Sequence, residues 1–392
     1  MANQKLKIFA IVPSGFCFGL QHVTIDFFKH FNKTESLFLV SGWNDGEFIK
    51  LLNSNGLKYT ISWLGMFSRS LAWYQIKMSL SALIKMPRLY YDFFKVLKNF
   101  KPDVLFFANH HELILLYPAL KLTKVPVVCH MHDPAPVIPF QKKTFAHYNS
   151  VVNHFIAISD NVRERTIELG CPPEKITTVH NGIELPPEKR VARNNSFIEQ
   201  FNWQHDVFIV GITGQMTHTK GHQDLLSAFK IAYSKNPKLR LVIGGRFIEP
   251  LYSELQACIK EWQMENVIVF TGWLPSVNTF FNGIDLFVLA SRHDEGYGLV
   301  VAEAMATNLP VIITHSGGAV EIVEDGINGY IVPKSDVQMM AEKISYLSAN
   351  PELASQMGDK GRQHIEQNFA MKHQAGLLEN LVIKISTDAI RK

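Results

Sequence analysis

Short runs of apolar residues recur along the chain, and each is followed by a stretch with the apolar spacing of a helix. Runs that are apolar at every position predict strands buried on both faces, as in parallel sheets covered by helices. The expected strands are residues 6–12, 37–40, 104–108, 125–130 and 155–159, then 207–213, 239–245, 267–272, 285–290 and 310–314. From about residue 338 the pattern is helical. Two series of strands predict an α/β protein with two Rossmann-like domains.

A polar, charged and proline-containing segment separates the two series of strands. We place a linker at residues 186–202, a first domain at 1–185 and a second at 203–392, which includes the C-terminal helices. The length agrees, because 392 residues exceed what one ordinary core accommodates. Two domains are therefore expected.

Composition indicates a packed globular protein, with 47% hydrophobic and 19% charged residues. The four cysteines are scattered without metal-site or disulfide spacing, which favours a reducing, cytoplasmic location. The first apolar run is expected to be a strand and not a signal peptide. No uninterrupted apolar stretch reaches the roughly 20 residues of a membrane span. No nucleic-acid recognition module is visible.

The stretch DEGYGLVVAEAM (294–305) combines acids with a glycine-rich entry into an apolar helix. In open parallel sheets, ligands bind beyond the carboxyl ends of strands, and this stretch follows one. Gly296 and Gly298 let the backbone approach a ligand, and the amides of a helix N-terminus favour phosphate. Glu295 and Glu303 can accept hydrogen bonds from vicinal hydroxyls on either side. A phosphate centre between two diol-binding carboxylates predicts a nucleotide-sugar site.

Other strand ends carry further candidates. Lys220 closes a short loop after the first strand of the second half, where it can neutralise a departing diphosphate. His132 follows a strand end in the first half, with His130 as a neighbouring competitor. Gly15 lies in the turn after the first strand, which is also an ordinary place for a glycine.

Together these motifs resemble the retaining glycosyltransferases of family 4, which have the GT-B fold. The resemblance covers most of the chain and is strongest over residues 291–333, where Glu295 and Glu303 precede a Gly-Gly loop. It implies two Rossmann-like domains with parallel sheets facing across a cleft. The stretch 175–186 is similar to the closing strand of the family's first domain.

The resemblance also implies roles for matching residues. Glu295 is expected to contact the donor sugar, Glu303 the ribose hydroxyls, and His132 the donor sugar from the first domain. Gly15 is expected to let the N-terminal loop approach the phosphates. The diphosphate is expected to bind Lys220 and the backbone of Gly296, Tyr297, Gly298 and Leu299.

One position departs from the family pattern. Gln215 stands where an arginine often follows the glycine of the phosphate loop, so a hydrogen-bond donor is kept but the charge is lost. Gln215 is still expected to bind the donor, and Arg246 is a candidate for supplying the missing charge.

The resemblance implies transfer of a hexosyl group from a nucleoside-diphosphate sugar to a hydroxyl of a glycan or lipid-linked acceptor, with retained anomeric configuration. Bacterial surface polysaccharide synthesis is the expected setting. No Asp-x-Asp cluster follows a strand, so neither a metal nor a cofactor is expected. A nucleotide-sugar epimerase and an inactive nucleotide-sugar-binding protein remain alternatives.

Residues 63–101 are rich in basic and aromatic residues and contain a single acid. Five apolar residues there fall at helical spacing: Trp73, Ile76, Leu80, Leu83 and Ile84. Such a helix suits an anionic membrane surface, which would place the protein peripherally on the inner face of the membrane. An ordinary helix packed on the first sheet, with its lysines outside, is the equal alternative.

Overall fold

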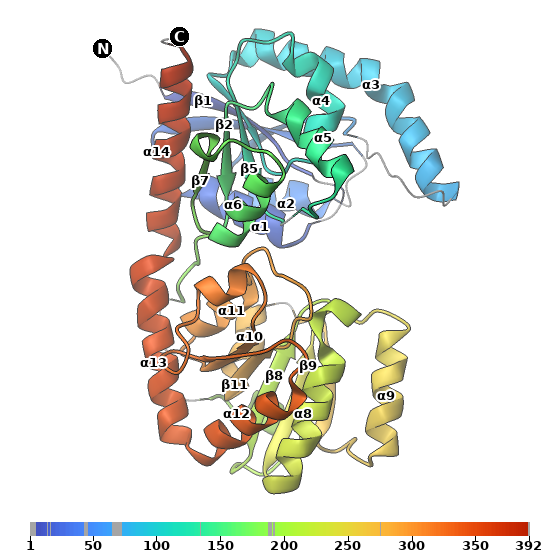
Figure 1. Ribbon diagram of the computed structural model, residues 1–392, viewed down its shortest axis with the longest axis vertical. Helices are drawn as coiled ribbons and strands as arrows, with labels where there is room; N and C mark the ends of the chain where they lie inside the picture. The colour runs from blue at the N-terminus through green and yellow to red at the C-terminus, as the bar shows by residue number, and fades with distance from the viewer. Residues whose placement is uncertain are drawn as a thin grey trace. The chain divides into compact units, whose positions relative to one another are not determined.

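The computed structural model describes residues 5–390 except 14, 16, 43–45, 65–72, 134, 187–189, 191–192 and 275, and omits the side chains of 73–76, 78 and 390. Within the basic and aromatic segment 63–101, Phe67 and the side chains of Trp73, Tyr74 and Ile76 therefore lie outside the description. The chain divides into two compact units (Figure 1). The first comprises Met1–Gly182 and Met371–Lys392, and the second Ile183–Ala370.

The first unit is built on a parallel sheet. Its strands are β1 (Leu6–Ile11), β2 (Thr34–Ser41), β3 (Lys58–Ser62), β4 (Val104–Phe107), β5 (Val127–Met131), β6 (His154–Ala157) and β7 (Ile176–Thr178). Its helices are α1 (Gly19–Lys29), α2 (Glu47–Ser54), α3 (Trp73–Phe100), α4 (Leu113–Leu120), α5 (Pro139–Tyr148), α6 (Asp160–Glu168) and α14 (Met371–Ile390). The strand order among the described residues is β3-β2-β1-β4-β5-β6-β7. In β1 every residue from Ile8 onward is fully buried, and in β4 every residue from Val104 onward is.

The second unit repeats the plan. Its strands are β8 (Phe208–Thr213), β9 (Leu239–Gly244), β10 (Ile268–Gly272), β11 (Leu286–Leu289), β12 (Val311–Thr314) and β13 (Tyr330–Val332). Its helices are α7 (Ser196–Phe201), α8 (His222–Lys235), α9 (Leu251–Glu261), α10 (Val277–Asn282), α11 (Leu299–Ala306), α12 (Val337–Ala349) and α13 (Pro351–Asn368). The described strands pair in parallel in the order β10-β9-β8-β11-β12-β13.

All ten expected strands are present, and the prediction of two Rossmann-like parallel-sheet units is confirmed. The closing strand expected within 175–186 is β7. Strands β3 and β13 were not expected. The first has only one buried residue and the second spans three residues, so neither has the continuous apolar run that identifies a strand buried on both faces.

The boundaries of the units differ from those expected. Helix α14 groups with the first unit, because Glu379 on α14 accepts hydrogen bonds from the backbone nitrogens of Asn32 and Lys33 at 3.2 and 2.7 Å. Its carboxylate also accepts from Thr34 Oγ1 at 3.0 Å. Part of the expected linker is the helix α7, in which Phe197 and Ile198 are buried.

Candidate functional site

The second sheet has a topological switch point between β8 and β11. From β8 the chain runs outward through β9 and β10, and it then returns to β11 and runs the other way through β12 and β13. The loops after β8 and β11 therefore leave the sheet side by side. Such a switch point is where open α/β sheets bind ligands. Lys220 and Glu295 lie on these two loops.

Glycines hold the loop after β8 against the end of β11. Lys220 ends a short 3₁₀ turn, His218–Lys220, and Gly221 follows with φ of +67°. A Cβ atom added to Gly221 would lie 1.8 Å from the carbonyl oxygen of Ala290. Only glycine fits this close approach. The approach fixes the distance between the Lys220 loop and the Glu295 loop.

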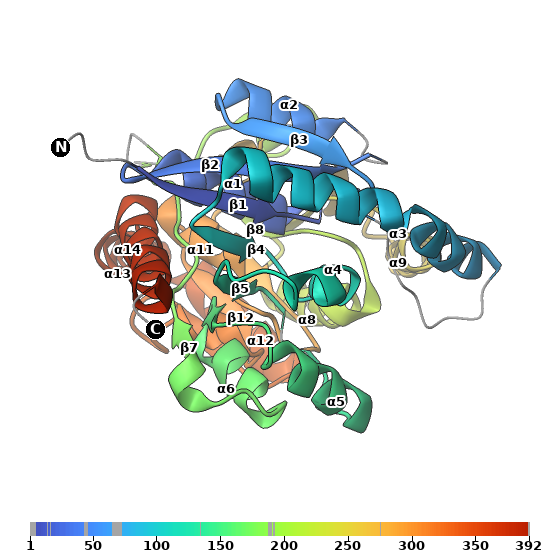
Figure 2. The same cartoon turned by 90° about the horizontal axis from the view of Figure 1, so that it is seen from above.

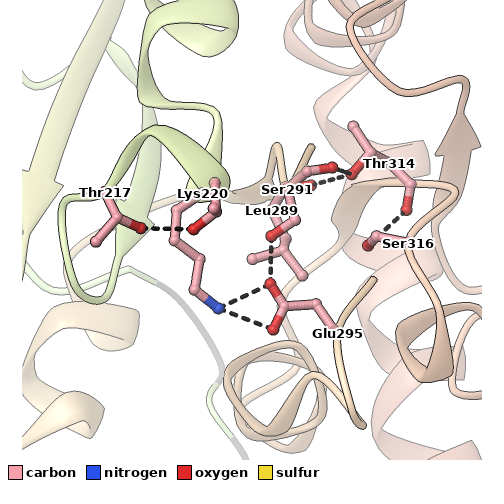
Figure 3. Close-up of polar contacts among 8 residues, drawn as sticks. Thr217, Lys220, Leu289, Ser291, Glu295, Thr314 and Ser316 are labelled. Atoms are coloured by element: carbon pink, nitrogen blue, oxygen red, sulfur yellow. Dashed lines mark hydrogen bonds and ion pairs between the residues drawn. The ribbon is translucent and has the colours of Figure 1, made fainter. Parts of the chain in front are cut away.

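Lys220 and Glu295 form a bidentate ion pair (Figure 3). The Lys220 Nζ atom lies 2.7 and 2.8 Å from the two carboxylate oxygens, and Ser291 Oγ donates a further hydrogen bond to Oε1. Thr314 Oγ1 in turn donates to the carbonyl oxygen of Ser291 at 2.6 Å. The lysine and glutamate side chains remain 32% and 17% exposed, so a ligand can reach both.

The backbone of Glu295 is fixed as firmly as its side chain. The carbonyl oxygen of Glu295 accepts from the N–H of Gly318 at 2.8 Å. Gly317 has φ of +54°, and a Cβ atom there would lie 2.5 Å from the same oxygen. The Gly-Gly loop expected from the sequence therefore supports the Glu295 loop. Gly317 is required by this packing, because any side chain there would collide with the Glu295 backbone.

Helix α11 begins directly after this loop. Gly298 is its N-cap residue with φ of +88°, and Leu299 is the first helical residue. Gly296 and Leu299 are half-buried, as is Glu303 one turn further along the helix. Tyr297 is 2% exposed, its ring packs against Phe369, and burial raises its pKa. Tyr297 can therefore offer a ligand only its backbone.

Gln215 and Arg246 lie on two loops that hydrogen-bond to each other. The N–H of Met216 donates to the carbonyl oxygen of Arg246 at 2.9 Å, and the N–H of Arg246 donates to that of Gly214 at 3.1 Å. Both Gln215 and Arg246 are exposed. The exposed Arg246 is therefore on the loop that pairs with the loop of Gln215.

A second ion pair, not recognised from the sequence, braces the same two loops. Arg292 forks the Asp224 carboxylate on α8 at 2.8 and 2.6 Å, and the Arg292 N–H donates to the carbonyl oxygen of Thr219 at 2.8 Å. Fork geometry fixes direction as well as distance. Arg292 and Asp224 thereby help to fix the position of the Lys220 loop relative to the Glu295 loop.

The other two candidates belong to the first unit. Gly15 is buried in the turn after β1. His132 is 7% exposed, and its Nε2 lies 3.1 Å from Nδ1 of His130. Burial lowers the pKa of His132 to about 3, so the ring is neutral at physiological pH. The expected competitor His130 is thus a hydrogen-bonded partner of His132, and it is itself fully buried against Phe27 and Phe106.

Glu112, in the turn after β4, is a buried acid that the sequence analysis did not single out. It is 8% exposed, and burial raises its pKa to about 8. Its position soon after an expected strand end was the available signal. A carboxyl group in such surroundings is neutral at pH 7.

Replacing Glu112 with glutamine should stabilise the protein at pH 8 but not at pH 4.5. The folded pKa of about 8 lies above the ordinary 4.5, so the folded state holds a proton that the unfolded chain releases, and stability falls as pH rises between these values. The glutamine variant has no carboxyl group to ionise, so its stability does not fall in this way. Its advantage should grow by about 1.4 kcal/mol per pH unit across the window. Urea midpoints measured along the pH series test this.

The matched control is Glu174→Gln, because Glu174 is an exposed acid of the same unit. Its urea midpoint should track that of the wild type at every pH. An advantage of Glu112→Gln that does not change with pH would contradict the buried, protonated carboxyl.

Two family models match the chain. Glycosyl transferases group 1 matches residues 194–364, and Glycosyltransferase Family 4 matches residues 75–185. The capsular polysaccharide biosynthesis glycosyltransferase CapM of Staphylococcus aureus is 31% identical over 55% of this chain and 57% of its own length. The lipopolysaccharide core biosynthesis mannosyltransferase LpcC of Rhizobium leguminosarum bv. viciae is 26% identical over 52% and 58%. The aligned part of the chain thus spans little more than half the length of these relatives.

Solved structures are similar over nearly the whole chain. HepE of Anabaena, in complex with UDP and glucose, has a TM-score of 0.79 at 20% identity, covering 96% of this chain and 99% of its own. A glycosyltransferase of Rickettsia africae has a TM-score of 0.79 at 22% identity, covering 97% and 99%. At these identities the structures establish the fold. The two family models, which together match residues 75–185 and 194–364, show that the chain belongs to the family 4 glycosyltransferases, and the solved structures show that it has the GT-B fold.

Proposed function

We propose that the protein transfers a hexosyl group from a nucleoside-diphosphate sugar to a hydroxyl of a glycan or lipid-linked acceptor, with retention at the anomeric carbon. The observation that carries the proposal is the Lys220–Glu295 pair at the switch point, directly before helix α11. A cation and a helix N-terminus suit a diphosphate, and a carboxylate suits sugar hydroxyls. The relatives named for capsule and lipopolysaccharide synthesis support bacterial surface polysaccharide as the setting.

The donor must compete with the existing ion pair. A diphosphate at the start of α11 attracts Lys220 Nζ, which releases carboxylate lone pairs of Glu295 for the hydroxyls of the transferred sugar. Glu303, on the next turn of α11, is assigned to the ribose. The backbone of residues 296–299 is assigned to the phosphates, Gln215 and Arg246 lie on adjoining loops, and Gly15 keeps the phosphate role that the resemblance implies.

The barrier to transfer is the separation of charge between the anomeric carbon and the departing diphosphate. Lys220 and the α11 amides stabilise the negative charge, and fixed donors of this kind contribute about 3 kcal/mol each. Neutral His132 supplies a hydrogen bond to the donor sugar without adding a competing charge. Retention then follows if the acceptor attacks on the face from which the diphosphate leaves and the phosphate takes the proton. No metal or cofactor is assigned a role.

A panel of UDP- and GDP-hexoses tests the proposal. One donor should raise the melting temperature, because ligand at a hundred times its Kd stabilises by about 2.7 kcal/mol. With that donor and a glycan acceptor, the product should keep the donor's anomeric configuration by NMR, and EDTA should not change the rate. Epimerised donor formed without acceptor would identify an isomerase. Binding without any turnover would identify an inactive binding protein.

A further inference from the structure

Helix α3 has one face packed on the first unit. Ala82, Leu89 and Phe93 are at most 1% exposed, and the ring of Phe93 lies 6.0 Å from that of Phe9 on β1. These residues share one side of the helix, because positions three to four apart fall on the same face. The second half of α3 is therefore anchored on the sheet.

The opposite face of α3 is an exposed apolar stripe. Its large members, with exposed fractions, are Leu80 (52%), Leu83 (54%), Ile84 (78%), Tyr91 (61%) and Phe94 (36%). On a regular helix of 3.6 residues per turn they would fall within an arc of about 100° over roughly 20 Å, and Pro87 lies in the helix between Ile84 and Tyr91. A continuous exposed apolar surface of this kind indicates an interaction site. The face expected from the sequence is thus apolar, and it points away from the core.

The beginning of α3 extends beyond the sheet and the other helices of the first unit (Figures 1 and 2). Leu80, Leu83 and Ile84 of the stripe belong to the first half of α3. No helix among the described residues is long and apolar enough to cross a bilayer. Any contact of α3 with lipid would have to lie along the membrane surface.

Basic residues accompany the stripe. Lys77, Lys95 and Lys98 are exposed on α3. Arg88 pairs with the helix's single acid, Asp92, at 2.9 Å. Lys85 lies 3.4 Å from the centre of the Trp63 ring. Lysine is depleted at protein interfaces, whereas apolar helices flanked by lysine suit anionic lipid headgroups. The lysines of α3 therefore favour a lipid partner over a protein one.

We infer that the stripe of α3 docks on the surface of an anionic bilayer. This inference rests on the proposed function and deepens it, because it places the enzyme where a lipid-linked acceptor is presented. The apolar side chains enter the boundary between headgroups and acyl chains, while the lysines stay with the phosphates.

Flotation of the full-length protein with vesicles tests the inference. The bound fraction should be about tenfold higher with vesicles containing phosphatidylglycerol than with phosphatidylcholine alone. The double variant Leu83→Ser, Ile84→Ser should lose about tenfold of that binding. The control is Leu122→Ser, because Leu122 is 77% exposed on the same unit but is not part of α3. It should float like the wild type.

Equal flotation with both vesicle types, or unchanged flotation of the double variant, would overturn the inference. So would light scattering that shows a dimeric wild type and a monomeric double variant, because the stripe would then join two copies of the chain. The donor-induced melting shift, measured on the same preparations, separates the two proposals. A double variant that loses flotation but keeps the shift supports a surface independent of the donor site. A wild type that floats without any donor shift would contradict the proposed function alone.

Discussion

Replacing Lys220 with alanine should lower kcat by about a hundredfold or more at saturating donor. The variant loses the cation that we propose neutralises the departing diphosphate, and Gln215 leaves the neighbouring loop without the arginine charge that the family often has there. UDP should also bind more weakly, because in the proposed site Lys220 contacts the diphosphate before transfer as well as during it. Initial rates and UDP titration measure the two effects.

Lys238→Ala is the matched control. Lys238 is 64% exposed on the same unit, where it pairs with Asp206, and such surface pairs contribute little. Its kcat should equal that of the wild type. A correctly folded Lys220→Ala protein with wild-type kcat would remove Lys220 from the mechanism.

Replacing Glu295 with alanine should also lower turnover by about a hundredfold, but with the opposite effect on UDP. UDP carries no transferred sugar, so it makes no contact with the lost carboxylate. Lys220 is also freed from the pair in which it now lies 2.7 Å from Glu295. We therefore expect UDP to bind as tightly as to the wild type or more tightly, while the nucleotide sugar loses affinity relative to UDP. Parallel titrations with the two ligands measure this contrast.

The control is Glu342→Ala, since Glu342 is an exposed acid on α12. It should change neither titration. An equal loss of affinity for UDP and for the nucleotide sugar in Glu295→Ala would show that Glu295 acts on the phosphates or on the fold. The assignment of Glu295 to the sugar would then be wrong.

The fold was largely predictable because its strands are buried on both faces. A run such as LFVL in β11 is apolar at every position, and only a covered parallel sheet uses such runs repeatedly. Strand β13 has only three residues and was missed. The place of α14 could not be predicted, because an amphipathic helix does not specify which sheet it covers. Glu379 identifies its partner only through contacts with residues nearly 350 positions away.

Site residues were predictable where charged side chains come directly after an expected strand. Lys220 and Glu295 were found in this way, but their direct pairing was not, because it depends on how closely Gly221 lets two loops approach. The ion pair between Arg292 in a loop and Asp224 on α8 was missed, because no sequence pattern shows that these two single charges meet. For α3, spacing identified the apolar face but could not tell whether that face packs on the sheet or points outward.

The return of α14 to the first unit has a consequence for how the chain is made. The second unit is inserted between two parts of the first, so the ribosome completes residues 183–370 before it supplies the last helix of the earlier unit. Until then, the backbone nitrogens of Asn32 and Lys33 lack the carboxylate of Glu379. The portion of the protein synthesised first is thus the last to be finished, and the inserted portion can reach its folded state while the nascent chain is still attached.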